Sequence, residues 1–336
     1  MNRSSIRHLA LGAFAFLAAA AAPPPEALER GREATQTLLT GDAASLEARF
    51  TGEMLQLIRA KGGAARFGAE IRSIAGAELE LLREAAYEEN GSTIYYRESR
   101  FERVPRLTTR WVFAADGRIS GAWIGPSPTP APTRHQDYST KAPLRLPFGP
   151  IEDGGWYVTW GGRDAISNYH VIARDQRFAY DFIAMRGGSA FSGDGRRNED
   201  HVCWDQPVFA PAAGRIVSAL GSVRDNQRPG YSSEGVPAPG NHVVIDHGGG
   251  EYSLVAHFRF GTLAVRKGQK VKSGELLGRC GNSGNSSQPH IHYHLQTGRS
   301  FGEGEGLPAF FNHYVADGAP VERGEPQRGQ LVVPGD

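Results

Sequence analysis

The stretch Gln288-Pro-His-Ile-His-Tyr-His294 sets three histidines at alternating positions. In a β-strand, residues two apart lie on one face, so His290, His292 and His294 would point the same way while the apolar residues between them face the core. Imidazole is the commonest protein ligand for zinc and the usual proton carrier near neutral pH. The pattern therefore predicts a strand that forms half of a metal site. A surface strand that is merely rich in histidine is the alternative.

Around this stretch, the chain of 336 residues is long enough for two domains with separate cores. Its apolar, charged and aromatic fractions are ordinary for a globular protein. The formal charge is +1 and no long basic run occurs, which argues against a nucleic-acid partner.

Residues 1–22 are predicted to be a secretory signal peptide. Arg3 and Arg7 give a basic start, residues 9–16 an apolar centre, and the following alanine run a cleavage region. A membrane anchor is the alternative, but the apolar stretch is short for a membrane span. No other transmembrane candidate occurs in the sequence. We therefore expect an exported protein, periplasmic or secreted, without a membrane span once the signal is cleaved.

The sequence contains two cysteines, Cys203 and Cys280. In an exported protein a pair of cysteines is more often a disulfide than a metal site. We expect the two to be bridged, with two buried free thiols as the alternative.

Alternating prolines between Pro126 and Thr133 predict an extended linker over residues 126–140. The region before it, 26–125, begins with helical spacing and then changes to a period of two with Asn-Gly and Asp-Gly hairpin signals. The expected helices are 27–39 and 44–60, and the expected strands are 78–82, 93–101, 107–113 and 119–124. This predicts an N-terminal α+β accessory domain, with helices followed by an antiparallel meander. The order resembles small cone-shaped domains of the SnoaL-like type.

The region after the linker, 141–325, is rich in glycine, valine and short alternating runs. It shows little helical periodicity, and the expected strand-and-turn segments are 210–219, 241–247, 252–258 and 272–279. We therefore expect a C-terminal mainly-β domain built on antiparallel sheet.

The segment Gly281-Asn-Ser-Gly-Asn-Ser-Ser-Gln-Pro-His-Ile-His292 resembles the signature that closes lysostaphin-type (LytM-type) zinc metallopeptidases. Four earlier segments resemble other blocks of that family: 210–217, 240–247, 256–257 and 265–278. The resemblance as a whole covers about residues 160–297. The resemblance implies one zinc ion bound by His292. It further implies that His257 and His290 act in catalysis.

The family's other two ligands come as His-x-x-x-Asp, and the matching segment here is Arg177-Phe-Ala-Tyr-Asp181. Asp181 fits, but Arg177 stays protonated and cannot bind a metal. We expect His170 to replace the missing ligand, because a hairpin turn at 174–177 would set it directly across from Asp181, with Cβ atoms about 4.5–5.5 Å apart. A slip of one residue would put the two on opposite faces. His170, Asp181 and His292 would then bind zinc and leave a fourth position for water.

An alternative ligand pair is His201-Val-Cys-Trp-Asp205, which satisfies His-x-x-x-Asp literally. It lacks small and apolar residues around the aspartate, so we interpret it as a loop. Asn168 is a candidate for orienting a ligand. His294 stands where the family often has an acid, and we assign it no role.

The resemblance implies an exported zinc metalloendopeptidase whose substrate is the peptide part of bacterial peptidoglycan. Zinc would lower the pKa of a bound water and polarise the scissile carbonyl, and His257 and His290 would move its proton and stabilise the oxyanion. The main alternative is a catalytically degenerate member that binds cell wall or regulates a cell-wall amidase, which the departure at Arg177 favours. A third possibility is a non-enzymatic adhesion module without metal. The oligomeric state is left open.

Overall fold

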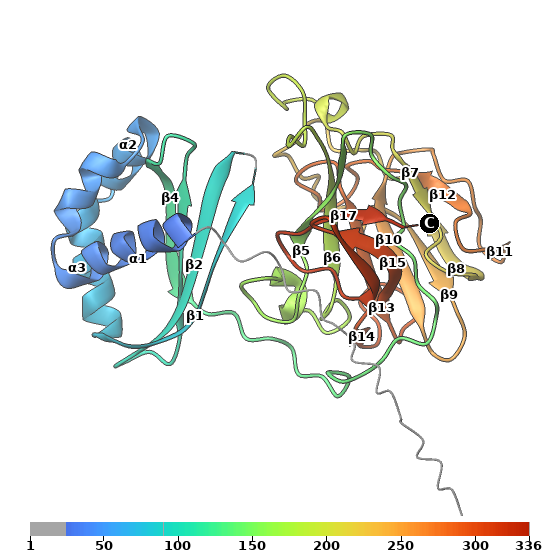
Figure 1. Ribbon diagram of the computed structural model, residues 1–336, viewed down its shortest axis with the longest axis horizontal. Helices are drawn as coiled ribbons and strands as arrows, with labels where there is room; N and C mark the ends of the chain where they lie inside the picture. The colour runs from blue at the N-terminus through green and yellow to red at the C-terminus, as the bar shows by residue number, and fades with distance from the viewer. Residues whose placement is uncertain (1–24, 90, 336) are drawn as a thin grey trace, which may run out of the picture.

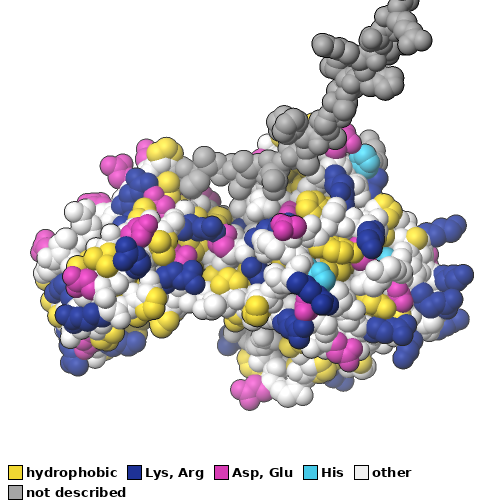
Figure 2. Space-filling view, turned by 90° about the horizontal axis from the view of Figure 1, so that it is seen from below, with side chains coloured by type: hydrophobic (Ala, Val, Ile, Leu, Met, Phe, Trp, Pro, Cys, Tyr) yellow, Lys and Arg dark blue, Asp and Glu magenta, His cyan; other side chains and the backbone are white. Residues whose placement is uncertain are grey.

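The computed structural model describes residues 25–89 and 91–335. The predicted signal peptide, residues 1–22, lies outside them. None of the helices in the described part is long and apolar enough to cross a membrane. Figure 1 shows a helical and sheet-containing region beside a larger, mainly-β region. Figure 2 shows basic and acidic side chains interspersed over much of one face of both regions.

The first region packs helices on one face of a four-stranded antiparallel meander. Its helices are α1 (Pro25–Thr40), the 3-10 helix η1 (Ala43–Arg49), α2 (Gly52–Ala60) and α3 (Gly63–Ala75). Its strands, in spatial order, are β1 (Glu78–Glu89), β2 (Ser92–Phe101), β3 (Leu107–Phe113) and β4 (Ile119–Pro126). The sheet face without helices is turned toward the second region (Figure 1). The α+β prediction is confirmed.

The single helix expected over 44–60 is divided in two. Phe50 is extended, which ends η1 after Arg49. Thr51 then caps α2, because its side-chain oxygen accepts a hydrogen bond from the Met54 amide at 3.3 Å. Helix α3 follows after Gly62 and was not expected from the sequence.

The second region is built on a large antiparallel sheet, as predicted, in the order β11-β8-β9-β10-β13-β6-β5-β17-β15-β16, with β14 paired to β13. A two-stranded sheet of β7 and β12 accompanies it. The bounds are β5 (Gly154–Trp160), β6 (Tyr180–Arg186), β7 (Pro207–Phe209), β8 (Gly214–Leu220), β9 (Asn241–Asp246), β10 (Tyr252–Phe258), β11 (Lys270–Val271), β12 (Leu276–Arg279), β13 (Ile291–Gln296), β14 (Gly306–Leu307), β15 (Phe311–Ala316), β16 (Ala319–Gly324) and β17 (Leu331–Pro334). Two 3-10 helices, η2 (Tyr169–Ile172) and η3 (Asn198–Asp200), lie in its loops. The sheet continues past residue 325, the expected end of the domain, because β17 lies at Leu331–Pro334.

Strand β13 lies at the centre of this sheet, hydrogen-bonded to β10 on one side and β6 on the other. Ile291, Tyr293 and Leu295 are buried in the main hydrophobic core, as the alternating pattern predicts. The intervening histidines occupy the opposite face and are also buried. On one edge, β10 pairs with β13 from His292 to Gln296; on the other, β6 pairs with Ile291–Tyr293 and β14 with the last two residues. Backbone hydrogen bonds on both edges therefore hold the side chains that β13 carries.

The disulfide between Cys203 and Cys280 is present, with the two Cα atoms 5.9 Å apart. It joins the loop before β7 to the residue that precedes the Gly281–Ser287 loop. Because that loop leads into β13, the bridge anchors one entry to the histidine-bearing strand.

Candidate functional site

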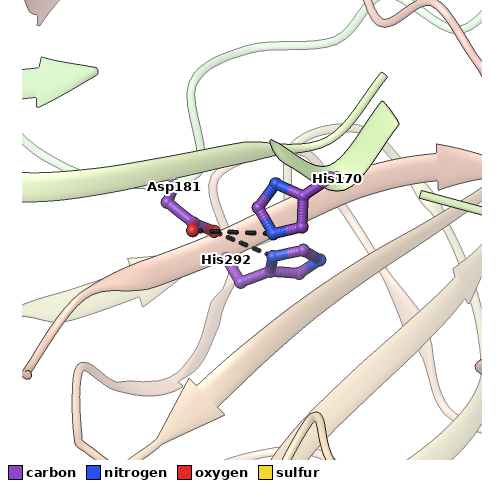
Figure 3. A group of neighbouring side chains, drawn as sticks. All are labelled: His170, Asp181 and His292. Carbon is purple, nitrogen blue, oxygen red and sulfur yellow. Dashed lines mark hydrogen bonds and ion pairs between the residues drawn. The ribbon is translucent and has the colours of Figure 1, made fainter. Parts of the chain in front are cut away.

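Three side chains from separate segments converge on one face of β13 (Figure 3): His292 from β13, Asp181 from β6 and His170 from η2. His292 Nδ1 lies 2.9 Å from Asp181 Oδ1, and His170 Nε2 lies 3.6 Å from Asp181 Oδ2. All three residues are buried, and one ligand atom from each lies within 4.8 Å of the other two. Two imidazole nitrogens and a carboxylate at this spacing can hold one metal ion.

The strand pairing expected for His170 is wrong. His170 lies in the 3-10 helix η2, where its carbonyl accepts a hydrogen bond from the Ala173 amide at 2.8 Å. The direct cross-strand partner of Asp181 is instead His292, across the ladder between β6 and β13. His170 still lies beside Asp181, because the short segment after η2 leads into β6, and Asp181 is the second residue of that strand.

A chain of hydrogen bonds fixes which nitrogen of His292 carries the proton. Gln296 Nε2 donates to two backbone carbonyls of the following turn, both at 3.0 Å, so its Oε1 faces His294 Nε2 at 2.8 Å as the acceptor. His294 therefore carries its proton on Nε2 and accepts at Nδ1, 2.8 Å from His292 Nε2. Burial holds the pKa of His294 well below its ordinary value, which keeps the ring neutral. His292 consequently donates from Nε2, and its Nδ1 faces the carboxylate.

Asn168 fixes His170 in the same manner. Its Nδ2 donates to the carbonyls of Gly162 and Ala179, at 3.0 and 2.9 Å, which leaves Oδ1 as an acceptor. His170 Nδ1 lies 3.0 Å from that oxygen and donates to it. The lone pair of His170 Nε2 is then directed at Asp181.

The Asp181 carboxylate thus faces two imidazole nitrogens whose tautomers direct lone pairs toward it. Acceptors at this distance repel one another unless a positive charge lies between them. A zinc ion supplies such a charge, and two imidazole nitrogens with one carboxylate are ligand types that it prefers. The residues present therefore fit a zinc ion with two histidine ligands and one carboxylate ligand.

The protonation states agree with this donor set. Burial lowers the pKa of His170 to about 3, and the charge of Asp181 opposes the shift only in part. Burial would raise the pKa of Asp181, but the imidazoles of His170, His290 and His292 outweigh it and hold that pKa well below its usual range. Near neutral pH, His170 is neutral and Asp181 is ionised, as metal binding requires.

His290 and His257 border the same space. His290 Nδ1 donates to the Gln288 carbonyl at 2.8 Å, and its Nε2 lies 3.7 Å from Asp181 Oδ1. His257 Nδ1 donates to the Ser283 carbonyl at 2.7 Å. The ring centroids of His257 and His290 are 4.6 Å apart. In its neutral form, each ring therefore carries its proton on Nδ1 and presents Nε2 as an acceptor.

His257 owes its direction to an irregular backbone. It has a φ of 66°, a left-handed conformation that only glycine adopts freely. The pairing of β10 with β9 shifts register at this point, between Ala256 and Phe258, which is the mark of a β-bulge. Bulges beside functional sites re-aim side chains, and this one sets His257 near His290.

Two cavities flank the three converging residues, and Tyr169 and Asn285 line both. One cavity, of about 260 Å³, includes Trp160, Asp181 and His290 in its lining. The other, of about 160 Å³, is lined by residues that include His170, His257, His292 and Phe301. A larger cavity of about 740 Å³ lies in the first region and contains none of these histidines. The site therefore opens into a cleft on two sides.

The sequence profile of Peptidase family M23 matches residues 201–302, a segment that includes His257, His290 and His292. Lipoprotein NlpD of Yersinia enterocolitica is 32% identical to this chain over 91 residues, which are 27% of this chain and 77% of that protein. This chain belongs to peptidase family M23. His170 and Asp181 precede the segment that the profile matches, so their assignment rests on the geometry described above.

A further relative, the peptidoglycan DD-endopeptidase ShyA of Vibrio cholerae, is 42% identical over 59 residues. The match is 18% of this chain and 13% of ShyA, so the chain spans a small part of that relative's length. Among solved structures, the catalytic domain of lysostaphin from Staphylococcus simulans is 20% identical, with 48% of this chain and 83% of that chain covered and a TM-score of 0.25.

In this M23 chain, the literal His-x-x-x-Asp motif does not join the three converging residues. His201 Nε2 lies 3.1 Å from the Gly195 carbonyl. Asp205 forms ion pairs with Arg259 and Arg279, with nitrogen–oxygen distances of 2.7 and 3.8 Å. Cys203 between them is disulfide-bonded.

Arg177 also has a structural role. Its Nε donates to the Ala131 carbonyl of the linker at 3.1 Å, and its Nη1 donates to the Arg163 carbonyl at 2.9 Å. The arginine that departs from the family pattern therefore fastens the linker to a loop of the second region.

Sequence reasoning missed the role of Gln296 and assigned none to His294. The signal was available, because the alternation that places His290, His292 and His294 on one face continues to Gln296. Asn168 was named as a candidate for orienting a ligand, and its contact with His170 Nδ1 agrees with that prediction.

Proposed function

We propose that this protein is an exported zinc metalloendopeptidase that hydrolyses peptide bonds in peptidoglycan, with one zinc ion bound by His170, Asp181 and His292. The observation that carries the proposal is the pair of fixed tautomers, which direct lone pairs of both histidines at the Asp181 carboxylate. The name of ShyA, a peptidoglycan DD-endopeptidase, supports the substrate class. The predicted signal peptide supports a location outside the cytoplasm, periplasmic or secreted.

Zinc bound there supplies a Lewis acid that polarises the scissile carbonyl and lowers the pKa of a water molecule. His290 and His257 are the residues that handle protons, since each has Nδ1 committed to a backbone carbonyl and Nε2 available. One of them accepts the proton of the attacking water, and the leaving amine takes a proton from the pair. Once protonated, an imidazole also stabilises the negative charge that develops on the carbonyl oxygen.

The first test is the zinc content of the purified mature protein, compared with His170→Ala and His201→Ala. We expect one zinc per chain in the wild type and in His201→Ala, and none in His170→Ala. Digestion of purified peptidoglycan by the zinc-loaded wild type, with His290→Ala as the inactive control, then tests the reaction. A protein that takes up no zinc after reconstitution would refute the hydrolase proposal and favour a degenerate, cell-wall-binding or amidase-regulating role.

A further inference from the structure

The guanidinium of Arg328 is buried between the two regions of the protein, with its side chain 1% exposed. Its Cζ lies 3.8 Å from the ring centroid of Trp160 and 4.2 and 4.9 Å from those of Tyr87 and Tyr96. Trp160 ends β5 of the second region, whereas Tyr87 and Tyr96 come from β1 and β2 of the first. We call these four residues the junction cluster. Cation–aromatic contacts are strongest where water is excluded, so this cluster holds the regions together.

The junction cluster is bonded to the loop that carries His170. Arg328 Nη1 donates to the carbonyl of Ile166 at 2.7 Å. Its Nη2 lies 3.4 Å from the Tyr96 hydroxyl and 3.7 Å from a carboxylate oxygen of Glu89, both in the first region. One guanidinium therefore connects the sheet of the first region to the 161–170 loop.

A second link reaches the same loop. Asp164 Oδ1 accepts hydrogen bonds from the amides of Ile166 and Ser167, at 3.0 and 3.1 Å, and its other carboxylate oxygen pairs with Arg83 of β1. Both members of that pair are partly exposed, so the pair itself stabilises little. The pair nevertheless links β1 to the loop beside His170, because the Asp164 carbonyl accepts a hydrogen bond from the amide of Asn168 at 2.8 Å.

The aromatic contacts continue from the junction cluster to the metal site. Trp160 and Tyr169 meet edge to face with centroids 5.1 Å apart, and Tyr169 lies 3.9 Å from the ring of His170. Trp160 and Tyr169 also line the cavity beside Asp181. A displacement of Trp160 would therefore be transmitted through Tyr169 to His170.

His170 needs such support more than the other two proposed ligands. Asp181 and His292 are direct partners in a β-ladder, which fixes both backbones. His170 lies outside the sheet, in a single turn of 3-10 helix at the end of a loop. Sites built on loops are held less precisely than sites built on strands, unless other groups pack on the loop.

We propose that Arg328 is a positioning residue, through which the first region holds the 161–170 loop where His170 meets Asp181. The first region is then a structural component of the metal site, and disruption of the junction cluster weakens zinc binding although no zinc ligand is altered. The inference rests on the proposed zinc site, and its test therefore includes a measurement on metal-free protein.

The test uses the full mature chain with Arg328→Gln, Arg328→Lys and Tyr87→Leu. Tyr87→Leu removes contacts from the first-region side only and leaves the second region's sequence intact. Arg323→Gln is the matched control, since Arg323 lies 5.0 Å from the ring of Phe310 in a cation–aromatic contact of the second region and does not touch the junction cluster. Zinc affinity is measured by competition with a chromophoric chelator, and amide hydrogen exchange of residues 161–170 is measured without metal.

We expect the zinc dissociation constant to rise about tenfold in Arg328→Gln, in the range seen for residues that orient ligands, with a smaller rise in Arg328→Lys and in Tyr87→Leu. Exchange of residues 161–170 should be faster in these variants and unchanged in Arg323→Gln. Unchanged exchange in Arg328→Gln and Tyr87→Leu, or faster exchange with unchanged zinc affinity, would overturn the positioning role. A wild type that binds no zinc would instead refute the proposed function, while the exchange result still decides whether the first region holds the loop.

Discussion

His292 and Asp181 are direct partners across the ladder between β13 and β6, and the Nδ1 of one lies 2.9 Å from the Oδ1 of the other. The two residues are 111 positions apart in the sequence. Backbone hydrogen bonds join their strands at the point where the two side chains meet. The distance between these two atoms is set by strand geometry and needs no loop to maintain it.

Replacing Gln296 by leucine should weaken zinc binding. The substitution removes the acceptor that holds the His294 proton on Nε2, so His294 can adopt the other tautomer and no longer accept from His292. Loss of groups that orient a ligand typically reduces metal affinity 10- to 100-fold. Titration against a chelator checks this. Gln269→Leu is the control, because the Gln269 side chain donates to Glu275, 6 residues along the chain, and not to the histidines of the site. An unchanged dissociation constant would show that the hydrogen-bond chain does not fix the tautomer.

Replacing both Cys203 and Cys280 by serine should destabilise the protein. The disulfide closes a loop of 77 residues, for which chain entropy predicts about 4 kcal/mol of stabilisation. Urea denaturation of the oxidised wild type and the double variant measures the difference in the free energy of unfolding. The single variants serve as controls, since each alone should lose as much as the pair. Equal midpoints for all four proteins would contradict the prediction.

The free energy of unfolding of the metal-free protein should fall as the pH falls below about 6.5. Burial lowers the pKa of His201 and of His242 in the folded protein. Because the unfolded chain then binds protons that the folded chain does not, stability is greatest above the unfolded pKa and is lost as the pH falls toward the folded values. Urea denaturation at pH 7, 6 and 5 measures the slope, and His201→Gln should make it shallower. A slope that is unaffected by the substitution would exclude His201 as a source.

Much of this structure follows from periodicity. Alternation in residues 288–294 places the histidines on one face of β13, and the same period predicts the four-stranded meander. The division of the 44–60 helix was not predicted, because a β-conformation at Phe50 leaves no composition signal. The contact between His170 and Asp181 was predicted from a strand pairing that does not exist. The sequence around His170 is typical of a strand, but Asn168 caps a 3-10 helix there by accepting a hydrogen bond from the His170 amide. Arg328 could not have been assigned, because its partners are more than 150 residues away along the chain: Tyr87, Tyr96 and Trp160.

The left-handed backbone of His257 sets two requirements against each other at one position. The bulge favours glycine or asparagine, and an ordinary side chain there costs about 1 kcal/mol. The proposed chemistry, however, requires an imidazole. A redesign that ranks substitutions by thermal stability alone would therefore replace His257. The resulting protein would be more stable but would lack a proposed proton carrier. Any stabilisation of this fold should hold residue 257 fixed and look for its gains elsewhere.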